Sequence, residues 1–126
     1  MAGSKGSKYY DVKLDYNIKL INKINNNTVI NNELFNLLQC LHKENSLTKA
    51  AEKLSFSYRK AWNLISNAEK SLSFKLTESK RGGKEGGETL LSIDGNNLLN
   101  AYIELKSEFD TSISNITQKF FHKINK

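Results

Sequence analysis

The fold is decided by SLTKAAEKL at residues 46–54, SFSYRKAWN at 55–63 and KRGGKEGG at 80–87. The first stretch predicts a short helix that begins after Ser46, since a serine hydroxyl can accept a hydrogen bond from an open amide of a first turn. Ser57 stands in the same position before a second helix, and Ser55 and Phe56 form the turn between the two. The third stretch carries four glycines among residues 82–87, which predict the tip of a basic hairpin.

The second of these helices, predicted over residues 58–71, has two distinct faces. Its apolar face consists of Ala61, Leu64, Ile65, Ala68 and Leu72. Its other face is basic and rich in amides, as a helix that contacts base edges and phosphates needs to be. A helix, a turn, a polar helix and a basic hairpin predict a winged helix-turn-helix, in a chain that is mainly α with a small β component.

Two aromatic residues lie at the start of that helix. We expect Tyr58 to contact a phosphate or a base, because it occupies the first helical position. We expect Trp62 to pack between the helix and the body of the domain, since a tryptophan belongs more often to a core than to a contact surface.

The charge of the chain supports this interpretation. The net charge is +6, and residues 43–84 carry ten Lys or Arg against four Glu. Residues 1–42 carry five positive and three negative groups, and residues 85–126 carry four and six. The positive excess therefore coincides with the predicted helices and hairpin, where it would attract a phosphate backbone. A generally lysine-rich composition would not explain this localisation.

The residues before this region predict a strand and a helix. Apolar residues alternate over Tyr9–Ile21, which predicts a strand or small hairpin, and Asn25–Asn27 predicts a turn. A helix is expected from Asn31 or Asn32, because Leu34, Leu37, Leu38 and Leu41 recur at helical spacing.

The residues after it predict the wing and a long helix. Strands are expected over Phe74–Glu78 and Thr89–Ile93, with Lys80–Glu88 as the hairpin tip. Asp94 is expected to cap a helix that reaches about His122. We divide the chain into a disordered tail or tag remnant (1–8), a winged helix-turn-helix domain (9–93) and a dimerisation helix (94–126).

The long helix carries an apolar stripe at spacings of three and four. Exposed in a monomer, such a stripe would form a large apolar patch, so we expect it to pair with a second copy of the chain. The expected dimer interface consists of Leu98, Tyr102, Leu105, Phe109, Ile113, Ile116 and Phe120.

Several other functions find no support in the sequence. Cys40, His42 and His122 lack metal-ligand spacing, so we expect Cys40 in the core and both histidines in solvent. The glycine loop lacks the spacing of a phosphate-binding P-loop, and no catalytic arrangement stands out. We therefore expect no enzyme activity, no cofactor, no metal and no membrane-spanning segment. One cysteine and no signal-peptide pattern favour a cytoplasmic protein.

The order SLTKAAEKL, SYRKAWN, LTES, GGKEGG and TLLSIDGNNLL resembles the amino-terminal domain of ModE, the molybdate-responsive transcriptional regulators. That winged helix is similar to the one of LysR-type regulators, which share the Ala50-Ala51 and Leu54 pattern. The Tyr58–Trp62 run and the doubled glycines around Lys84 resemble ModE more specifically. The resemblance covers about residues 9–110.

The resemblance implies a homodimer that binds a palindromic DNA operator and controls genes for molybdate or tungstate uptake, most simply as a repressor. The chain ends after its long helix and does not include the oxyanion-binding carboxy-terminal domain of ModE. We therefore expect this chain to share DNA binding with ModE, but not molybdate sensing. The implied DNA-binding residues are Ser46, Thr48, Lys49, Ser57, Tyr58, Arg59, Lys60, Asn63, Lys80, Arg81 and Lys84.

Two alternatives stay open at this point. The chain could be a non-enzymatic interaction module that dimerises through its long helix, with an incidental basic patch. It could also be a direct oxyanion sensor, with the glycine loop and its Lys and Arg residues as the anion site. The sequence names neither the operator nor the signal.

Overall fold

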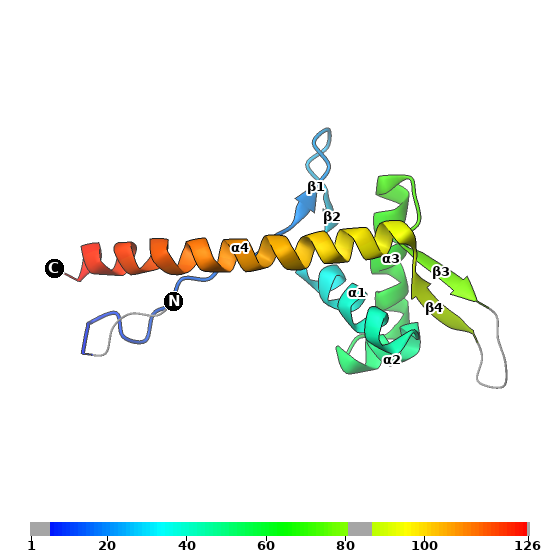
Figure 1. Ribbon diagram of the computed structural model, residues 1–126, viewed down its shortest axis with the longest axis horizontal. Coiled ribbons are helices and arrows are strands. Elements are labelled where there is room, and N and C mark those ends of the chain that lie inside the picture. The colour runs from blue at the N-terminus through cyan, green and yellow to red at the C-terminus, as the bar shows by residue number, and fades with distance from the viewer. Residues whose placement is uncertain (1–5, 81–86, 126) are drawn as a thin grey trace. The chain divides into compact units, whose positions relative to one another are not determined.

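The computed structural model describes residues 6–80 and 87–125 (Figure 1). Its elements are β1 (Leu20–Ile21), β2 (Thr28–Ile30), α1 (Asn32–Glu44), α2 (Leu47–Lys53), α3 (Tyr58–Leu72), β3 (Thr77–Lys80), β4 (Glu88–Leu91) and α4 (Ile93–Ile124). The chain divides into two compact units, residues 18–102 and residues 1–17 with 103–126. This division differs from the three segments expected from the sequence, because the start of α4 belongs to the first unit.

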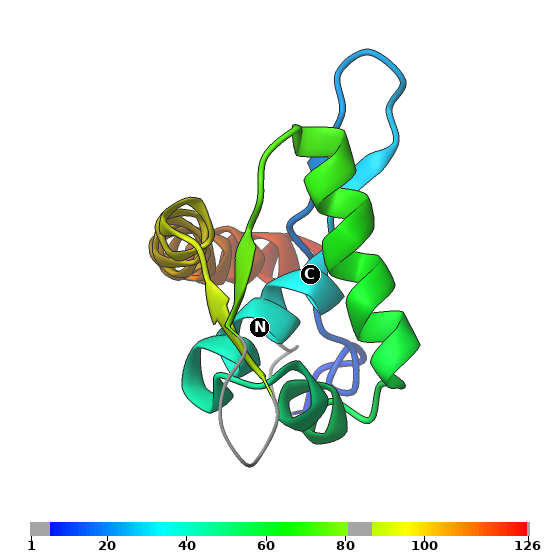
Figure 2. The ribbon, with the colours of Figure 1, turned by 90° about the vertical axis from the view of Figure 1, so that its right-hand side faces the viewer.

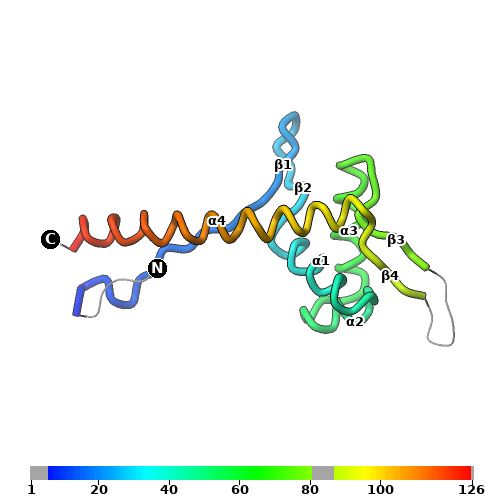
Figure 3. The backbone as a smooth tube through the Cα atoms, viewed as in Figure 1, coloured from blue at the N-terminus to red at the C-terminus, as the bar shows by residue number. Residues whose placement is uncertain are grey.

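The first three helices begin where the sequence predicts. The side chains of Asn31, Ser46 and Ser57 accept hydrogen bonds from the amides of residues 34, 49 and 60, at 2.9, 3.2 and 3.0 Å. Each cap satisfies an amide that the first turn would otherwise leave open. The connection between α1 and α2 is short, because Asn45, at φ 53°, adopts the left-handed conformation that ends α1. Figure 3 follows the chain through these turns.

Helix α1 forms the centre of the core of residues 18–102. Its buried residues are Leu34, Phe35, Leu37, Leu38 and Leu41. Ala50, Ala51 and Ala61 pack against the same cluster from α2 and α3, where small side chains allow helices to approach closely. The ring of Phe35 stacks on that of Tyr102, with centroids 3.7 Å apart. Cys40 is half-buried beside this core, and His42 is exposed, as expected.

The predicted strand over Tyr9–Ile21 is wrong for most of its length. Only Leu20–Ile21 forms a strand, which pairs antiparallel with Thr28–Ile30 across a turn where Asn26 has φ 62°. Residues before Asn17 belong to the other unit. There the rings of Tyr9 and Tyr16 lie 6.5 Å from those of Phe121 and Phe109 on α4, so aromatic contacts to a helix account for part of the apolar pattern.

The wing is an antiparallel pair, as predicted, with boundaries shifted by one to three residues. Thr77 pairs with Leu91 and Lys80 with Glu88. The expected hairpin tip, including Arg81 and Lys84, lies largely outside the described residues.

The cap of α4 is Ser92, and the prediction of Asp94 is wrong. The Ser92 hydroxyl accepts from the Gly95 amide at 3.0 Å and donates to the Lys75 carbonyl at 2.8 Å. The Ser92 amide donates to the Leu76 carbonyl at 2.9 Å. These bonds join the start of α4 to the segment that enters β3, so the first turn of α4 is held beside the wing.

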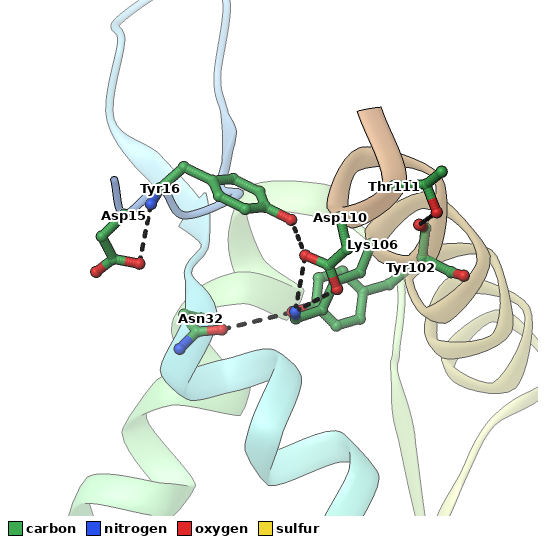
Figure 4. A network of polar contacts seen from close by, with 8 residues as sticks. Asp15, Tyr16, Asn32, Tyr102, Lys106, Asp110 and Thr111 are labelled. Carbon is green, nitrogen blue, oxygen red and sulfur yellow. Dashed lines mark hydrogen bonds and ion pairs between the residues drawn. The ribbon is translucent and has the colours of Figure 1, made fainter. Parts of the chain in front are cut away.

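In the second unit, residues 6–17 contact the carboxy-terminal half of α4. The ring of Tyr9 lies 6.5 Å from that of Phe121, and the Ser7 hydroxyl donates to the Asn125 side chain at 2.8 Å. Figure 4 shows Tyr16, which donates to Asp110, and Lys106, which pairs with the same carboxylate. The Tyr16 hydrogen bond, with the charge of Lys106, lowers the pKa of Asp110.

The apolar stripe of α4 is shared between these two environments. Tyr102 is 4 % exposed and Leu98 packs beside the core, so these two residues already pack within their own chain, and their place in a dimer interface stays a prediction. Further along, Leu105, Phe109, Ile116 and Phe120 remain exposed by 37–59 %. Phe121 and Thr117, which the stripe did not include, are buried instead. His122 is exposed, as expected.

No described helix combines the length and the apolar character that crossing a membrane requires. Within residues 6–80 and 87–125, no three His, Cys, Asp or Glu side chains are grouped as metal ligands.

Candidate DNA-binding surface

The start of α2, the start of α3 and the ends of the wing strands line one concave surface. It is formed by Ser46, Leu47, Thr48, Lys49, Glu52, Tyr58, Ser79, Lys80, Gly87, Glu88 and Thr89. An adjoining hollow on α3 shares Tyr58 and adds Arg59, Trp62 and Asn63. Figure 2 shows the described ends of β3 and β4 on the same side of this unit as the beginning of α3.

Most residues that the sequence singled out for DNA contact are placed around these hollows. Thr48, Lys49, Tyr58, Arg59, Asn63 and Lys80 are exposed there. Ser46 and Ser57 use their hydroxyl oxygens as helix caps, which orients the first turns of α2 and α3. Arg81 and Lys84 lie outside the described residues. Lys49 and Lys80 share the concave surface with Glu52 and Glu88, and Arg59 adds a positive charge in the adjoining hollow. The three cations are the groups there that a phosphate backbone would attract.

Lys60 differs from its neighbours. Its ammonium group pairs with the Glu33 carboxylate of α1 at 2.7 Å and lies 4.2 Å from the centre of the Phe56 ring. Both contacts hold Lys60 toward α1 and the turn before α3. Lys60 is therefore occupied within its own domain, and it is not among the residues that line the hollows described above.

Trp62 contradicts its predicted role. The side chain is 53 % exposed, whereas its neighbour Ala61 is fully buried. The core side of α3 is made by Ala61, Ile65 and Ala68, which are small or medium residues that let α3 lie close to α1. No room is left on that side for an indole. The small residues beside Trp62 were the signal in the sequence that could have predicted this exposure.

Glu69, which the sequence pattern did not single out, ties the wing to α3. One oxygen of its half-buried carboxylate accepts from the Leu76 amide at 2.7 Å and from the Thr77 amide at 3.1 Å. Lys75 lies 3.7 Å from the other oxygen. At the far strand, the Thr89 amide donates to the Asn45 carbonyl at 3.1 Å. The wing is thus held by hydrogen bonds to α3 and to the turn before α2.

We expect Glu69→Ala to destabilise the chain by about 1–3 kcal/mol, because it leaves two partly buried amides without their acceptor. Glu69→Gln keeps a side-chain oxygen and should cost less than half as much. Urea unfolding followed by circular dichroism measures both. Equal losses in the two variants would show that charge, and not hydrogen bonding, explains the role of Glu69.

One ion pair supports the turn between α1 and α2. The Glu44 carboxylate lies 2.9 Å from the Lys53 ammonium. This contact lowers the pKa of Glu44 and raises that of Lys53, so both groups stay charged at neutral pH. The Lys53 side chain is largely in solvent and Glu44 is half-buried at the surface, so the pair contributes little to stability.

No family model matches this chain. Among curated proteins, it is 25 % identical over 92 residues to the molybdenum transport protein ModE of Azotobacter vinelandii. It is 30 % identical over 93 residues to the protein of that name from Herbaspirillum seropedicae. These matches cover 73 and 74 % of this chain and 34 and 32 % of the relatives, so the chain spans about a third of their length.

The solved structures agree with the sequence relatives. The BenM DNA-binding domain in its complex with catB site 1 DNA matches with a TM-score of 0.53 and 26 % identity, over 68 % of this chain and 90 % of that one. The same domain with benA site 1 DNA gives a TM-score of 0.54 over 94 % of its length. The chain carries a ModE-like winged helix-turn-helix. The ModE-like domain also has the fold of LysR-type DNA-binding domains, as the resemblance implied.

Proposed function

We propose that this ModE-like chain is a sequence-specific transcriptional regulator that binds a palindromic operator in double-stranded DNA as a homodimer. The observation that carries the proposal is the shared surface of α2, α3 and the wing, where Lys49, Arg59 and Lys80 are exposed. The BenM structures support it, because that domain was solved on DNA with the same fold.

The amino-terminal part of α3 is the element that enters the major groove in our proposal. Ser57 caps it, and the exposed side chains of its first two turns include Arg59 and Asn63. A guanidinium matches the acceptors of guanine and an amide matches adenine, so these two residues suit base contacts. Lys49 and Lys80, on the flanking elements, suit phosphate contacts that add affinity without sequence preference.

The regulated genes are proposed from the relatives. Both curated relatives are named as molybdenum transport proteins, which supports a repressor of molybdate or tungstate transport genes. The same relatives support a regulator and not an enzyme. Because the chain spans a third of their length, direct binding of an oxyanion is not part of the proposal.

The proposed dimer uses the exposed part of the α4 stripe. Ile116 and Phe120 are 59 and 43 % exposed, and Leu105 and Phe109 continue the stripe toward the helix start. Pairing these side chains with a second copy would remove them from water, which is favourable in proportion to the apolar area buried.

A gel-shift titration tests the function. The probe is a duplex from the region upstream of the chain's own gene, with and without molybdate or tungstate, and the competitor is a shuffled duplex. A preference for the upstream duplex supports a regulator. Equal, weak binding of both duplexes would favour an interaction module, and binding that requires the oxyanion would favour the sensor.

We expect Arg59→Ala to weaken binding to the preferred duplex by about 1–3 kcal/mol and to relax the preference at one base pair in each half-site. The matched control is Lys70→Ala, which removes one positive charge from the last turn of the same helix, roughly 16 Å further along its axis. Titrations against a set of single-base variants measure the effect. A uniform loss over all variants would assign Arg59 to phosphate.

A further inference from the structure

An exposed aromatic pair lies on the helix that the proposed function places in the major groove. Tyr58 and Trp62, four residues apart on α3, are 55 and 53 % exposed. Residues at this spacing are neighbours on a helix surface. Both side chains line the hollow with Arg59 and Asn63, and both also line the hollow between α3 and the wing strands.

Burial explains why these rings are on the surface. The inner side of α3 is filled by Ala61, Ile65 and Ala68, each 5 % exposed or less. An isolated indole in water forgoes the favourable burial of a large apolar surface. Trp62 therefore lies at the surface and not in the core. There its apolar ring lies beside the positively charged Arg59.

Resting on the proposed function, we infer that Tyr58 and Trp62 form an apolar contact with the 5-methyl groups of thymines in the major groove. DNA is favoured as the occupant because Arg59 lines the hollow with both rings, and Lys49 and Lys80 line the adjoining concave surface that Tyr58 shares. In the major groove, the methyl group of thymine is the one apolar feature that distinguishes a base pair. Arg59 and Asn63 can form hydrogen bonds to base edges. The aromatic pair adds an apolar contact to the thymine methyl group, which favours A·T pairs at the contacted positions.

The chain offers a direct reporter for this contact. Trp62 is its single tryptophan, so the intrinsic indole emission comes from this side chain alone. In the free chain the exposed indole should emit as in water. On binding DNA, its emission should shift to shorter wavelength and become less accessible to a soluble quencher.

The experiment uses the full chain and duplexes that it selects from a random pool. Deoxyuridine then replaces each thymine of the selected duplex in turn, which removes one methyl group and leaves base pairing intact. At one or two positions per half-site, the wild-type chain should bind about three- to five-fold more weakly, as expected for one lost apolar carbon. Trp62→Ala should bind the thymine duplex about ten-fold more weakly and should not distinguish thymine from deoxyuridine at those positions.

Two further variants separate a contact from a general loss. Trp62→Phe should restore part of the thymine preference, because it keeps an aromatic face. Phe74→Ala, which truncates another exposed aromatic residue just beyond the far end of α3, should leave both affinity and preference unchanged. Unfolding curves should show all three variants folded, since neither Trp62 nor Phe74 belongs to the core.

The outcomes are distinct for the two proposals. If no duplex is enriched from the pool, the proposed function fails and the thymine contact fails with it. If duplexes are enriched but the emission of Trp62 is unchanged, only the thymine contact is overturned. The same holds if Trp62→Ala weakens thymine and deoxyuridine duplexes equally at every position, since that result assigns Trp62 to the backbone.

Discussion

Gly95→Ala should strongly destabilise the ModE-like domain, although it adds a single methyl group. A Cβ at this position would lie 2.1 Å from the Leu76 carbonyl oxygen and 3.1 Å from its carbon. The backbone there is held, because the same oxygen accepts from the Ser92 amide and the Leu76 amide donates to Glu69. We expect a loss of about 3 kcal/mol or more, at the upper end of the cost of overpacking.

Helix propensity alone predicts that Gly95→Ala would raise the stability of the domain. In an exposed helix, alanine stabilises by roughly 0.5–1 kcal/mol relative to glycine. Urea unfolding of Gly95→Ala, with the exposed Asn97→Ala in the same helix as the control, decides between the two. A stability equal to or above that of the wild type would show that α4 and the Leu76 segment do not approach each other closely.

Ile116→Glu should convert the proposed dimer into a monomer and weaken binding to a duplex with two half-sites by about a hundred-fold. Ile116 is 59 % exposed in the middle of the stripe, so the change leaves the single chain folded. In a dimer it would place two carboxylates against each other in an apolar seam, where burying charges is costly. The loss on DNA follows because the second half-site is then no longer bound intramolecularly.

Asn115→Glu is the matched control, since it adds the same charge at an exposed neighbouring position of α4. Light scattering at micromolar concentration gives the mass, and titrations with one and two half-sites give the DNA effect. Binding to a single half-site should be equal in both variants. An Ile116→Glu chain that stays dimeric, with wild-type affinity, would place the dimer contact elsewhere.

Local features of this chain could be predicted from sequence because the interactions that decide them are short in sequence. Asn31, Ser46 and Ser57 each accept a hydrogen bond from an amide three residues later. A serine or asparagine just before a helical apolar pattern therefore predicted where each of these helices begins. The apolar period of α1 and the antiparallel wing follow from equally local patterns.

Some features of the candidate site were decided over longer distances. Lys60 belongs to the same basic run as Arg59, yet Glu33, 27 residues earlier, holds its ammonium group. Glu69 has no distinguishing neighbours in the sequence, and its role appears only where β3 begins beside α3. Arg81 and Lys84 stay predictions, because they lie outside the described residues.

The sequence by itself determined the order of the helices, the capped starts of α1, α2 and α3, and the place of the positive charge. These features depend on residues only a few positions apart. Only the tertiary structure decided which side of each element is covered. It placed Trp62 outside, Tyr102 against Phe35, and Ser92 and not Asp94 at the start of α4. Burial depends on contacts between residues tens of positions apart, and a pattern along the chain shows which side is apolar but not what lies against it.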